Sequence, residues 1–208
     1  MKFFRRVASG IQVAPLLAEI QAQGDAWLAN TSRQDKIHVQ RDTNTIFLRG
    51  AVKRPDLHVN ENQESQPSQI SARFPLAMST MAKIAEMSKS SLSRATIVRL
   101  KPKSRVDQHI DVGSYYLIRN RFHLVLYSPS GSVLISGNEA VRMQAGELWW
   151  FDNKQHHSAY NESEEWRVHY IFDLLPQAYE RLAVNPLPPV AHGLESAAVP
   201  PSRVASSA

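Results

Sequence analysis

The segment His109-Ile110-Asp111 places an imidazole and a carboxylate two residues apart in a run that we expect to be a strand. Residues two apart on a strand point to the same side, so both polar side chains would face one space. A third metal-binding side chain, His157, stands near the start of another expected strand. Two histidines and one carboxylate leave coordination positions open, as in iron(II) sites that activate oxygen. Catalytic zinc uses the same donors, so these ligands alone do not identify the metal.

A His-x-Asp pattern occurs often by chance. Other polar residues on neighbouring strands are therefore needed as evidence that this one is a metal site. Arg167 lies ten residues after His157 in a run that reads as a strand. An arginine that points into a barrel needs an anion, and its planar guanidinium matches a carboxylate with two parallel hydrogen bonds. Arg121 and His123 share a face of an earlier expected strand and could donate to a second carboxylate near the metal. The three side chains therefore predict a clamp for a dicarboxylic keto acid.

Three neighbouring polar residues allow other interpretations. We expect Arg119, on the same run as the clamp, to be an exposed strand residue without a ligand. His156 adjoins the second histidine of the metal pattern and is expected to face solvent or to lie behind the ligands. His169 shares a strand face with Arg167, where it either lines the binding space or is a satisfied histidine of the core.

The elements that must position these residues are mostly strands. From Ala95 onward, β-branched and aromatic runs alternate with turn residues, which is typical of an all-β sandwich or barrel. Earlier in the chain, apolar spacing predicts helices over 12–29 and 74–87, with a strand over 45–50 and a loop over 55–69. The expected later strands are ATIVRL, YYLIRNRFHLVLY, SVLIS, GELWWF and EWRVHYIFDL.

These patterns divide the chain into three segments. Residues 1–94 are expected to form helices and strands that pack on a barrel, and residues 95–183 to form the barrel itself. Residues 184–208 contain five of the twelve prolines and are expected to be a disordered tail rich in Pro, Ala and Ser. The predicted fold class is therefore mainly β with flanking helices.

The composition excludes several classes of function. The chain has no cysteine, which excludes thiolate metal sites and cysteine nucleophiles and makes the cytoplasm the simplest compartment. No apolar run approaches the roughly 20 residues of a membrane helix, so we expect no membrane partner. The net charge is +5, but the basic residues are scattered apart from Lys101, Lys103 and Arg105. A nucleic-acid groove would be more basic, so we favour a small-molecule or peptide substrate and leave the oligomeric state open.

The ordered blocks between Ala95 and Leu174 resemble the aspartyl/asparaginyl β-hydroxylase family of Fe(II)- and 2-oxoglutarate-dependent oxygenases. In this order the blocks are far more specific than any single motif. The resemblance implies a double-stranded β-helix, a jelly-roll or cupin-like barrel with iron at its open end. The matching blocks are HID at 109–111, RFHLVL at 121–126, GELWWFDN at 146–153, His157, and RVHYIFD at 167–173.

By this resemblance His109, Asp111 and His157 would be the iron ligands and the catalytic residues. The name-giving animal enzymes resemble the chain through both histidines but lack the carboxylate between them. Asp111 is present here, so the chain is more similar to a bacterial branch with a complete triad.

The resemblance also implies 2-oxoglutarate as co-substrate and molecular oxygen as oxidant. Arg121 and His123 would bind the 2-oxoglutarate carboxylate nearest the metal, and Arg167 would bind the distal carboxylate. The expected reaction is hydroxylation of a C–H bond in an aspartyl or asparaginyl residue or in a free amino acid. A non-oxidative cupin-like metal-binding protein is the alternative, but it gives no role to Arg121 and Arg167.

Overall fold

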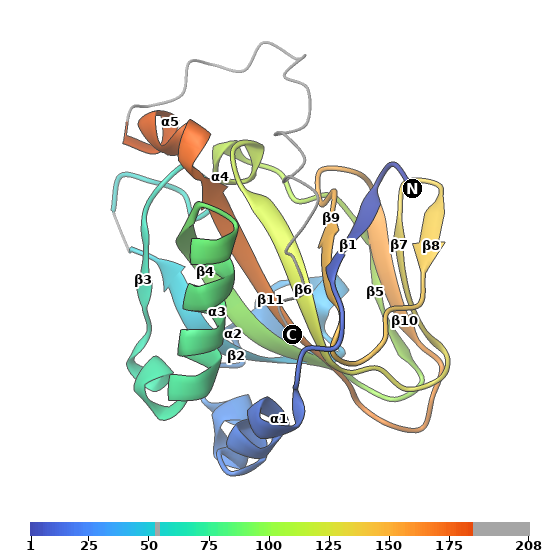
Figure 1. Ribbon diagram of the computed structural model, residues 1–208. Helices are drawn as coiled ribbons and strands as arrows, with labels where there is room; N and C mark the ends of the chain where they lie inside the picture. The colour runs from blue at the N-terminus through green and yellow to red at the C-terminus, as the bar shows by residue number, and fades with distance from the viewer. Residues whose placement is uncertain (53–54, 185–208) are drawn as a thin grey trace.

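Two antiparallel sheets that face each other form the centre of the molecule (Figure 1). The structure, a computed structural model, describes residues 1–52 and 55–184. The larger sheet has the strand order β1 (Phe4–Ala8), β9 (Leu148–Phe151), β6 (Asn120–Tyr127), β11 (Arg167–Pro176), β4 (Ser90–Leu100), β2 (Thr43–Ala51) and β3 (Ser65–Pro67). The smaller sheet has the order β5 (Ser104–His109), β10 (His157–Asn161), β7 (Ser132–Ser136) and β8 (Glu139–Val141).

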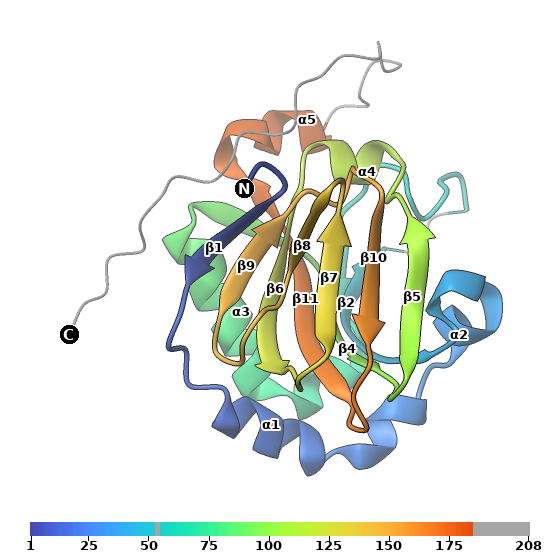
Figure 2. The ribbon, with the colours of Figure 1, turned by 90° about the vertical axis from the view of Figure 1, so that its right-hand side faces the viewer.

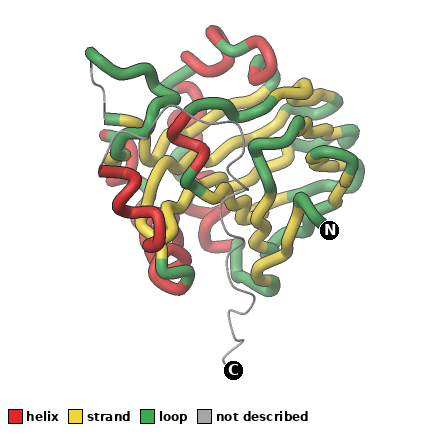
Figure 3. Tube along the Cα trace, turned by 90° about the horizontal axis from the view of Figure 1, so that it is seen from above, coloured by secondary structure: helices red, strands yellow, loops and turns green. Residues whose placement is uncertain are grey.

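Helices cover part of the outside of these layers. Figure 1 shows α3 (Pro75–Met87) on the face of the larger sheet that points away from the smaller sheet. Figure 3, viewed from above, shows strands and loops without helices on the side of the molecule near the N-terminus. The other helical elements are α1 (Ala14–Gln21), η1 (Gly24–Leu28), α2 (Ser32–Lys36), η2 (His38–Gln40), η3 (Gln69–Arg73), α4 (Ser114–Leu117), η4 (Gln177–Tyr179) and α5 (Glu180–Val184). The predicted class, a mainly β jelly-roll barrel with flanking helices, is confirmed.

Strands β6 and β11 are buried on both faces, and the two faces differ in character. Phe122, Leu124, Tyr170 and Phe172 pack into the core beneath the helices. Burying such a side chain contributes roughly 1.5–3 kcal/mol, which helps to offset the cost of the polar opposite face. Successive residues of a strand alternate between faces, so the residues in between face the smaller sheet. Those polar residues are Arg121, His123, Arg167 and His169.

The predicted helices and strands are mostly confirmed, with three differences. The helix expected over 12–29 ends at Gln21, and a 3-10 turn follows from Gly24, since glycine costs about 1 kcal/mol inside a helix. The segment 55–69 contains the short edge strand β3, in which Pro67 is tolerated because an edge strand has one unpaired side.

The run YYLIRNRFHLVLY is only partly a strand. Its first residues form α4, and β6 begins at Asn120. Gly113 precedes α4 with a φ of +123°, and a Cβ there would lie 2.3 Å from the carbonyl oxygen of Asn60. This close approach of two loops turns the chain into a short helix before the strand starts.

The predicted division at residues 94 and 95 falls inside β4, and β1, β2 and β3 from the first segment are strands of the larger sheet. The three-segment division itself stays a prediction. The expected disordered tail lies outside the described residues apart from residue 184, which ends α5. Within the described ranges, no helix combines the length and apolar character needed to cross a bilayer.

Candidate metal centre and cavity

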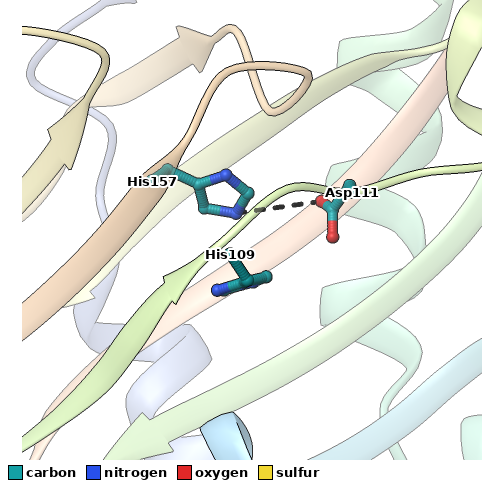
Figure 4. A group of neighbouring side chains, drawn as sticks. All are labelled: His109, Asp111 and His157. Carbon is teal, nitrogen blue, oxygen red and sulfur yellow. Dashed lines mark ion pairs between the residues drawn. The ribbon is translucent and has the colours of Figure 1, made fainter.

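Three metal-binding side chains meet at one end of the smaller sheet, pointing toward a common space (Figure 4). His109 ends β5 and His157 begins β10, and the two residues are direct partners in the antiparallel ladder. Asp111 lies in the loop beyond β5, where its backbone nitrogen donates to the carbonyl oxygen of Asn153 at 3.1 Å. One donor atom from each side chain lies within 4.8 Å of the other two. The structure thus brings together the three predicted ligands, which we call the metal group.

The two histidines of the metal group have matching proton arrangements. Nδ1 of His109 lies 2.8 Å from the carbonyl oxygen of Asp107, and Nδ1 of His157 lies 2.9 Å from that of Gln155. A carbonyl oxygen only accepts, so each Nδ1 carries the ring proton and each Nε2 keeps a free lone pair. Nε2 of His157 is 4.0 Å from Oδ2 of Asp111. Burial lowers the pKa of His157 to about 4, which keeps this ring neutral and able to bind a metal at neutral pH.

Asp111 is held as a carboxylate by its neighbours. Burial raises its pKa, but the charge of Arg121, the proximity of His157 and a hydrogen bond from Asn153 outweigh that effect, so the pKa is lowered. Nη1 of Arg121 and Nδ2 of Asn153 both donate to Oδ2 of Asp111, the latter at 2.9 Å. The metal group therefore offers a carboxylate and two imidazole nitrogens, a set of donors that fits a divalent cation.

Arg121 is shared between two carboxylates. Its cross-strand partner Asp173 accepts from Nε at 2.8 Å and from Nη2 at 2.9 Å, and Asp111 accepts from Nη1. Burial lowers the pKa of Arg121, but both carboxylates raise it more, so it stays well above its usual value. The sequence analysis did not assign a role to Asp173, which ends the block RVHYIFD. An aspartate between apolar strand residues is itself a signal of a buried partner.

Arg167 lies in a second polar cluster of the cavity, together with His123 and His169, and its environment differs from that of Arg121. It is 7% exposed and forms no ion pair with Asp or Glu within the part of the chain that the structure describes. Its Nε donates to Nε2 of His169 at 3.1 Å. Burial lowers the pKa of Arg167 to about 10. A buried cation without an anion is costly, so this guanidinium is poised to bind one.

The histidines beside Arg167 are linked to it and to each other by short polar contacts. Nε and Nη2 of Arg167 lie 3.1 Å from Nε2 and Nδ1 of His169, and the arginine can only donate in both contacts. Nδ1 of His169 also lies 3.1 Å from Nδ1 of His123, so the Nε2 nitrogen of His123 is left for a ligand. Burial lowers the pKa of both rings well below 6.5, and the charge of Arg167 lowers each further, so both are neutral.

One cavity joins the two histidines of the metal group to Arg167, His123 and His169. It encloses about 570 Å³, including its open mouth, and Leu100, Val106 and Ile171 supply apolar wall between the polar groups. The predicted residues His109, His157, Arg121, His123 and Arg167 all line it, and so does His169, the residue whose position was left open. The sequence analysis missed three further lining residues from the N-terminal part of the chain, Arg33, Gln40 and Thr43.

Two neighbouring residues lie outside the cavity lining. His156 is exposed, in line with the expectation for it. The expectation of an exposed Arg119 was wrong, because this residue is 4% exposed and donates to Asn62 and Ser93 at 2.8 and 3.0 Å. Arg119 precedes the first residue of β6, so the alternation of that strand does not apply to it.

The family model described as Aspartyl/Asparaginyl beta-hydroxylase matches residues 18–176. Among solved structures, EvdMO1 is 14% identical with a TM-score of 0.51, over 84% of this chain and 47% of that protein, a likeness that shows the fold alone. A prolyl-4-hydroxylase from Pseudomonas putida is 12% identical with a TM-score of 0.49, over 84% and 92% of the two chains. AviO1 from Streptomyces viridochromogenes Tue57 is 13% identical with a TM-score of 0.48, over 85% and 90%. No curated protein matches the chain.

Proposed function

Because the chain belongs to the aspartyl/asparaginyl β-hydroxylase family, and is thereby a 2-oxoglutarate- and Fe(II)-dependent oxygenase, we propose that it hydroxylates a C–H bond of an aspartyl or asparaginyl residue or of a free amino acid. One observation carries the assignment of the site. A single cavity is lined by both histidines of the metal group and by a buried arginine, Arg167, that lacks a carboxylate partner among the described residues. A metal site alone would give that arginine no role.

The metal group is proposed to hold the iron. His109 and His157 would bind through Nε2, since Nδ1 of each ring is occupied by a backbone carbonyl. Asp111 would bind as the ionised ligand, kept in place by Asn153 and Arg121. Iron bound there would supply the activation of oxygen and the oxidation of the C–H bond, coupled to conversion of 2-oxoglutarate to succinate and carbon dioxide.

The protein's own contribution would be to bind and orient 2-oxoglutarate. Arg167 is proposed to bind the distal carboxylate through two parallel hydrogen bonds, which replaces an unpaired buried charge by a paired one. His123 is proposed to donate from Nε2 to the carboxylate nearest the metal. Arg121 would donate to the same carboxylate, because its bonds to Asp111 and Asp173 use only three of its five N–H groups.

The decisive experiment is an anaerobic titration of the metal-free protein with Fe(II) and then with 2-oxoglutarate. We expect a visible charge-transfer band in the wild-type protein and none in His157→Ala or Asp111→Ala. The matched control is His156→Ala, which removes the exposed neighbouring histidine and should keep the band.

If iron binds but no band develops in the wild-type protein, 2-oxoglutarate is not the co-substrate. The chain is then better explained as a non-oxidative cupin-like metal-binding protein. If the band develops, release of succinate in the presence of oxygen then reports turnover. Its stimulation by candidate peptides and amino acids identifies the substrate.

A further inference from the structure

A second arginine without a partner, Arg33, reaches the cavity from the N-terminal part of the chain. It lies on α2 and lines the cavity together with His109, His157 and Arg121. The turn η2, which follows α2, packs against β5, the strand that ends at His109. Figure 2 shows α2 beside β5 at the edge of the smaller sheet. Arg33 is therefore close to the metal group although it is distant in the sequence.

The guanidinium of Arg33 is unpaired within the described ranges, where no hydrogen bond or ion pair involves it. The nearest acid on its own helix, Asp35, accepts instead from the hydroxyl of Thr31 at 2.8 Å. Burial lowers the pKa of Arg33 and the charge of Arg121 lowers it further, while Asp111 opposes the change. The positive charge of Arg33 therefore interacts with Asp111 of the metal group but is not paired with it.

Gln40 is a second polar side chain that is ready for a ligand. It lies on η2, lines the same cavity and is only 6% exposed. Its side-chain amide forms no hydrogen bond within the described ranges, although its backbone oxygen accepts from the hydroxyl of Thr43 at 2.7 Å. The amide therefore keeps its two N–H donors and its oxygen acceptor for a ligand. A bound polar molecule would use both its N–H groups and its oxygen.

The charges around the cavity leave room for one more anion after the co-substrate. Arg33, Arg121 and Arg167 together with a ferrous ion carry five positive charges, and Asp111 and Asp173 carry two negative ones. The 2-oxoglutarate dianion would reduce the excess of three positive charges to one. A low-dielectric cavity favours a ligand that balances this remaining charge.

We infer that Arg33 and Gln40 form the subsite for the carboxylate of the molecule that is hydroxylated. This inference rests on the proposed function, because it assigns Arg167 to the co-substrate and Arg33 to the substrate. The carboxylate is either the α-carboxylate of a free amino acid or the side chain of an aspartyl residue. The neutral side chain of an asparaginyl residue within a peptide would not balance Arg33.

The test is calorimetric binding to protein loaded with Fe(II) and 2-oxoglutarate under anaerobic conditions. The probes are the free proteinogenic L-amino acids and N-acetyl-aspartic acid amide, each beside the analogue in which its carboxylate is an amide. We expect at least one acid to bind the wild-type protein and its amide analogue to bind more weakly. Arg33→Gln should weaken binding of that acid roughly 10- to 100-fold, as expected for a lost charge-assisted hydrogen bond. Arg33→Lys should restore part of the loss.

The matched control is Lys36→Gln, which removes the same charge from an exposed position on the same helix and should bind the acid normally. The affinity for 2-oxoglutarate should be equal in the wild-type protein and in Arg33→Gln. A free amino acid with a neutral side chain among the binders identifies the α-carboxylate as the source. Binding of the blocked aspartate without any such amino acid identifies the side chain.

Three results overturn the inference. The first is that no acid binds the wild-type protein, and the second is that the acid binds Arg33→Gln as tightly as the wild-type protein. The third is that Arg33→Gln no longer binds 2-oxoglutarate, which would assign Arg33 to the co-substrate site. Failure of 2-oxoglutarate to bind the wild-type protein is a different result, because it overturns the proposed function first.

Discussion

Arg121 and Arg167 are two arginines of one cavity with opposite surroundings. They lie on neighbouring strands of the larger sheet, β6 and β11, and both face the smaller sheet. Arg121 meets two carboxylates, Asp111 and Asp173, whereas Arg167 meets only the ring of His169 among the described residues. The sequence analysis gave both arginines the same kind of role, binding of a carboxylate.

This difference distinguishes an arginine that holds the site together, Arg121, from an arginine whose charge is available for a ligand, Arg167. A charge that is already paired stabilises the fold and positions its partner, so Arg121 links Asp111 of the metal group to the strand β11. A buried charge without a partner destabilises the empty protein and gains an anion only when a ligand enters. Substitution of the two arginines should therefore have opposite effects on the stability of the ligand-free protein.

The largest expected effect is loss of stability in Arg121→Leu. This change leaves Asp173 and Asp111 buried without their counter-charge, which costs about 3–5 kcal/mol of unfolding free energy. Urea unfolding of the metal-free protein measures the loss. The double variant Arg121→Leu with Asp173→Leu should lose less than Arg121→Leu alone, because it removes one of the stranded charges. An equal or larger loss in the double variant would contradict the pairing argument.

Arg167→Gln should show the opposite pattern. Its unfolding free energy without ligand should be at least that of the wild-type protein, because an unpaired buried charge has been removed. Its affinity for 2-oxoglutarate should fall roughly 10- to 100-fold, and the thermal stabilisation by 2-oxoglutarate should shrink accordingly. Arg99→Gln is the control, since Arg99 stacks on Trp27 and Trp166 and does not line the cavity. Unchanged 2-oxoglutarate affinity in Arg167→Gln would remove Arg167 from the co-substrate site.

A smaller effect is expected from Asp173→Asn, which keeps the shape of the side chain and removes its charge. Arg121 then keeps Asp111 as its only carboxylate partner, so we expect a loss of about 1–3 kcal/mol in unfolding free energy. Equilibrium unfolding in urea compares this variant with Arg121→Leu. Equal losses in the two variants would mean that the Arg121–Asp173 pair accounts for the whole effect and that Asp111 adds nothing to it.

Strand alternation made much of the cavity predictable from the sequence. Arg121 and His123, and likewise Arg167 and His169, share a face because β6 and β11 are regular strands over those residues. The metal group was predicted as a set, but the stated reason was incomplete. Asp111 lies beyond the end of β5, and its hydrogen bond to Asn153 rather than strand geometry places it beside His157.

The residues that were missed depend on contacts between distant parts of the chain. Asp173 meets Arg121 through the register of β11 against β6, which no local pattern encodes. Arg33 reaches the cavity because η2 packs against β5, again a tertiary contact. The error over Arg119 had a local cause. Apolar residues lie on both sides of Arg119, so the sequence pattern of a short helix followed by a strand resembled that of one continuous strand.

The smallest expected effect concerns pH and the neutral histidines beside Arg167. His123 and His169 have pKa values well below 6.5 in the folded protein, so near pH 6 the unfolded chain takes up protons that the folded protein does not. Stability is therefore complete above pH 6.5 and falls as the pH decreases, with a slope of at most about 1.4 kcal/mol per pH unit for each such histidine.

The variant His169→Gln keeps an acceptor for Arg167 but removes one of these titrating groups. The slope between pH 6.5 and 5 should therefore be shallower by up to that amount. Urea unfolding of metal-free protein at several pH values measures the slope, with His156→Gln as the exposed control. An unchanged slope in His169→Gln would mean that His169 is protonated in the folded protein, and it could then no longer accept from Arg167.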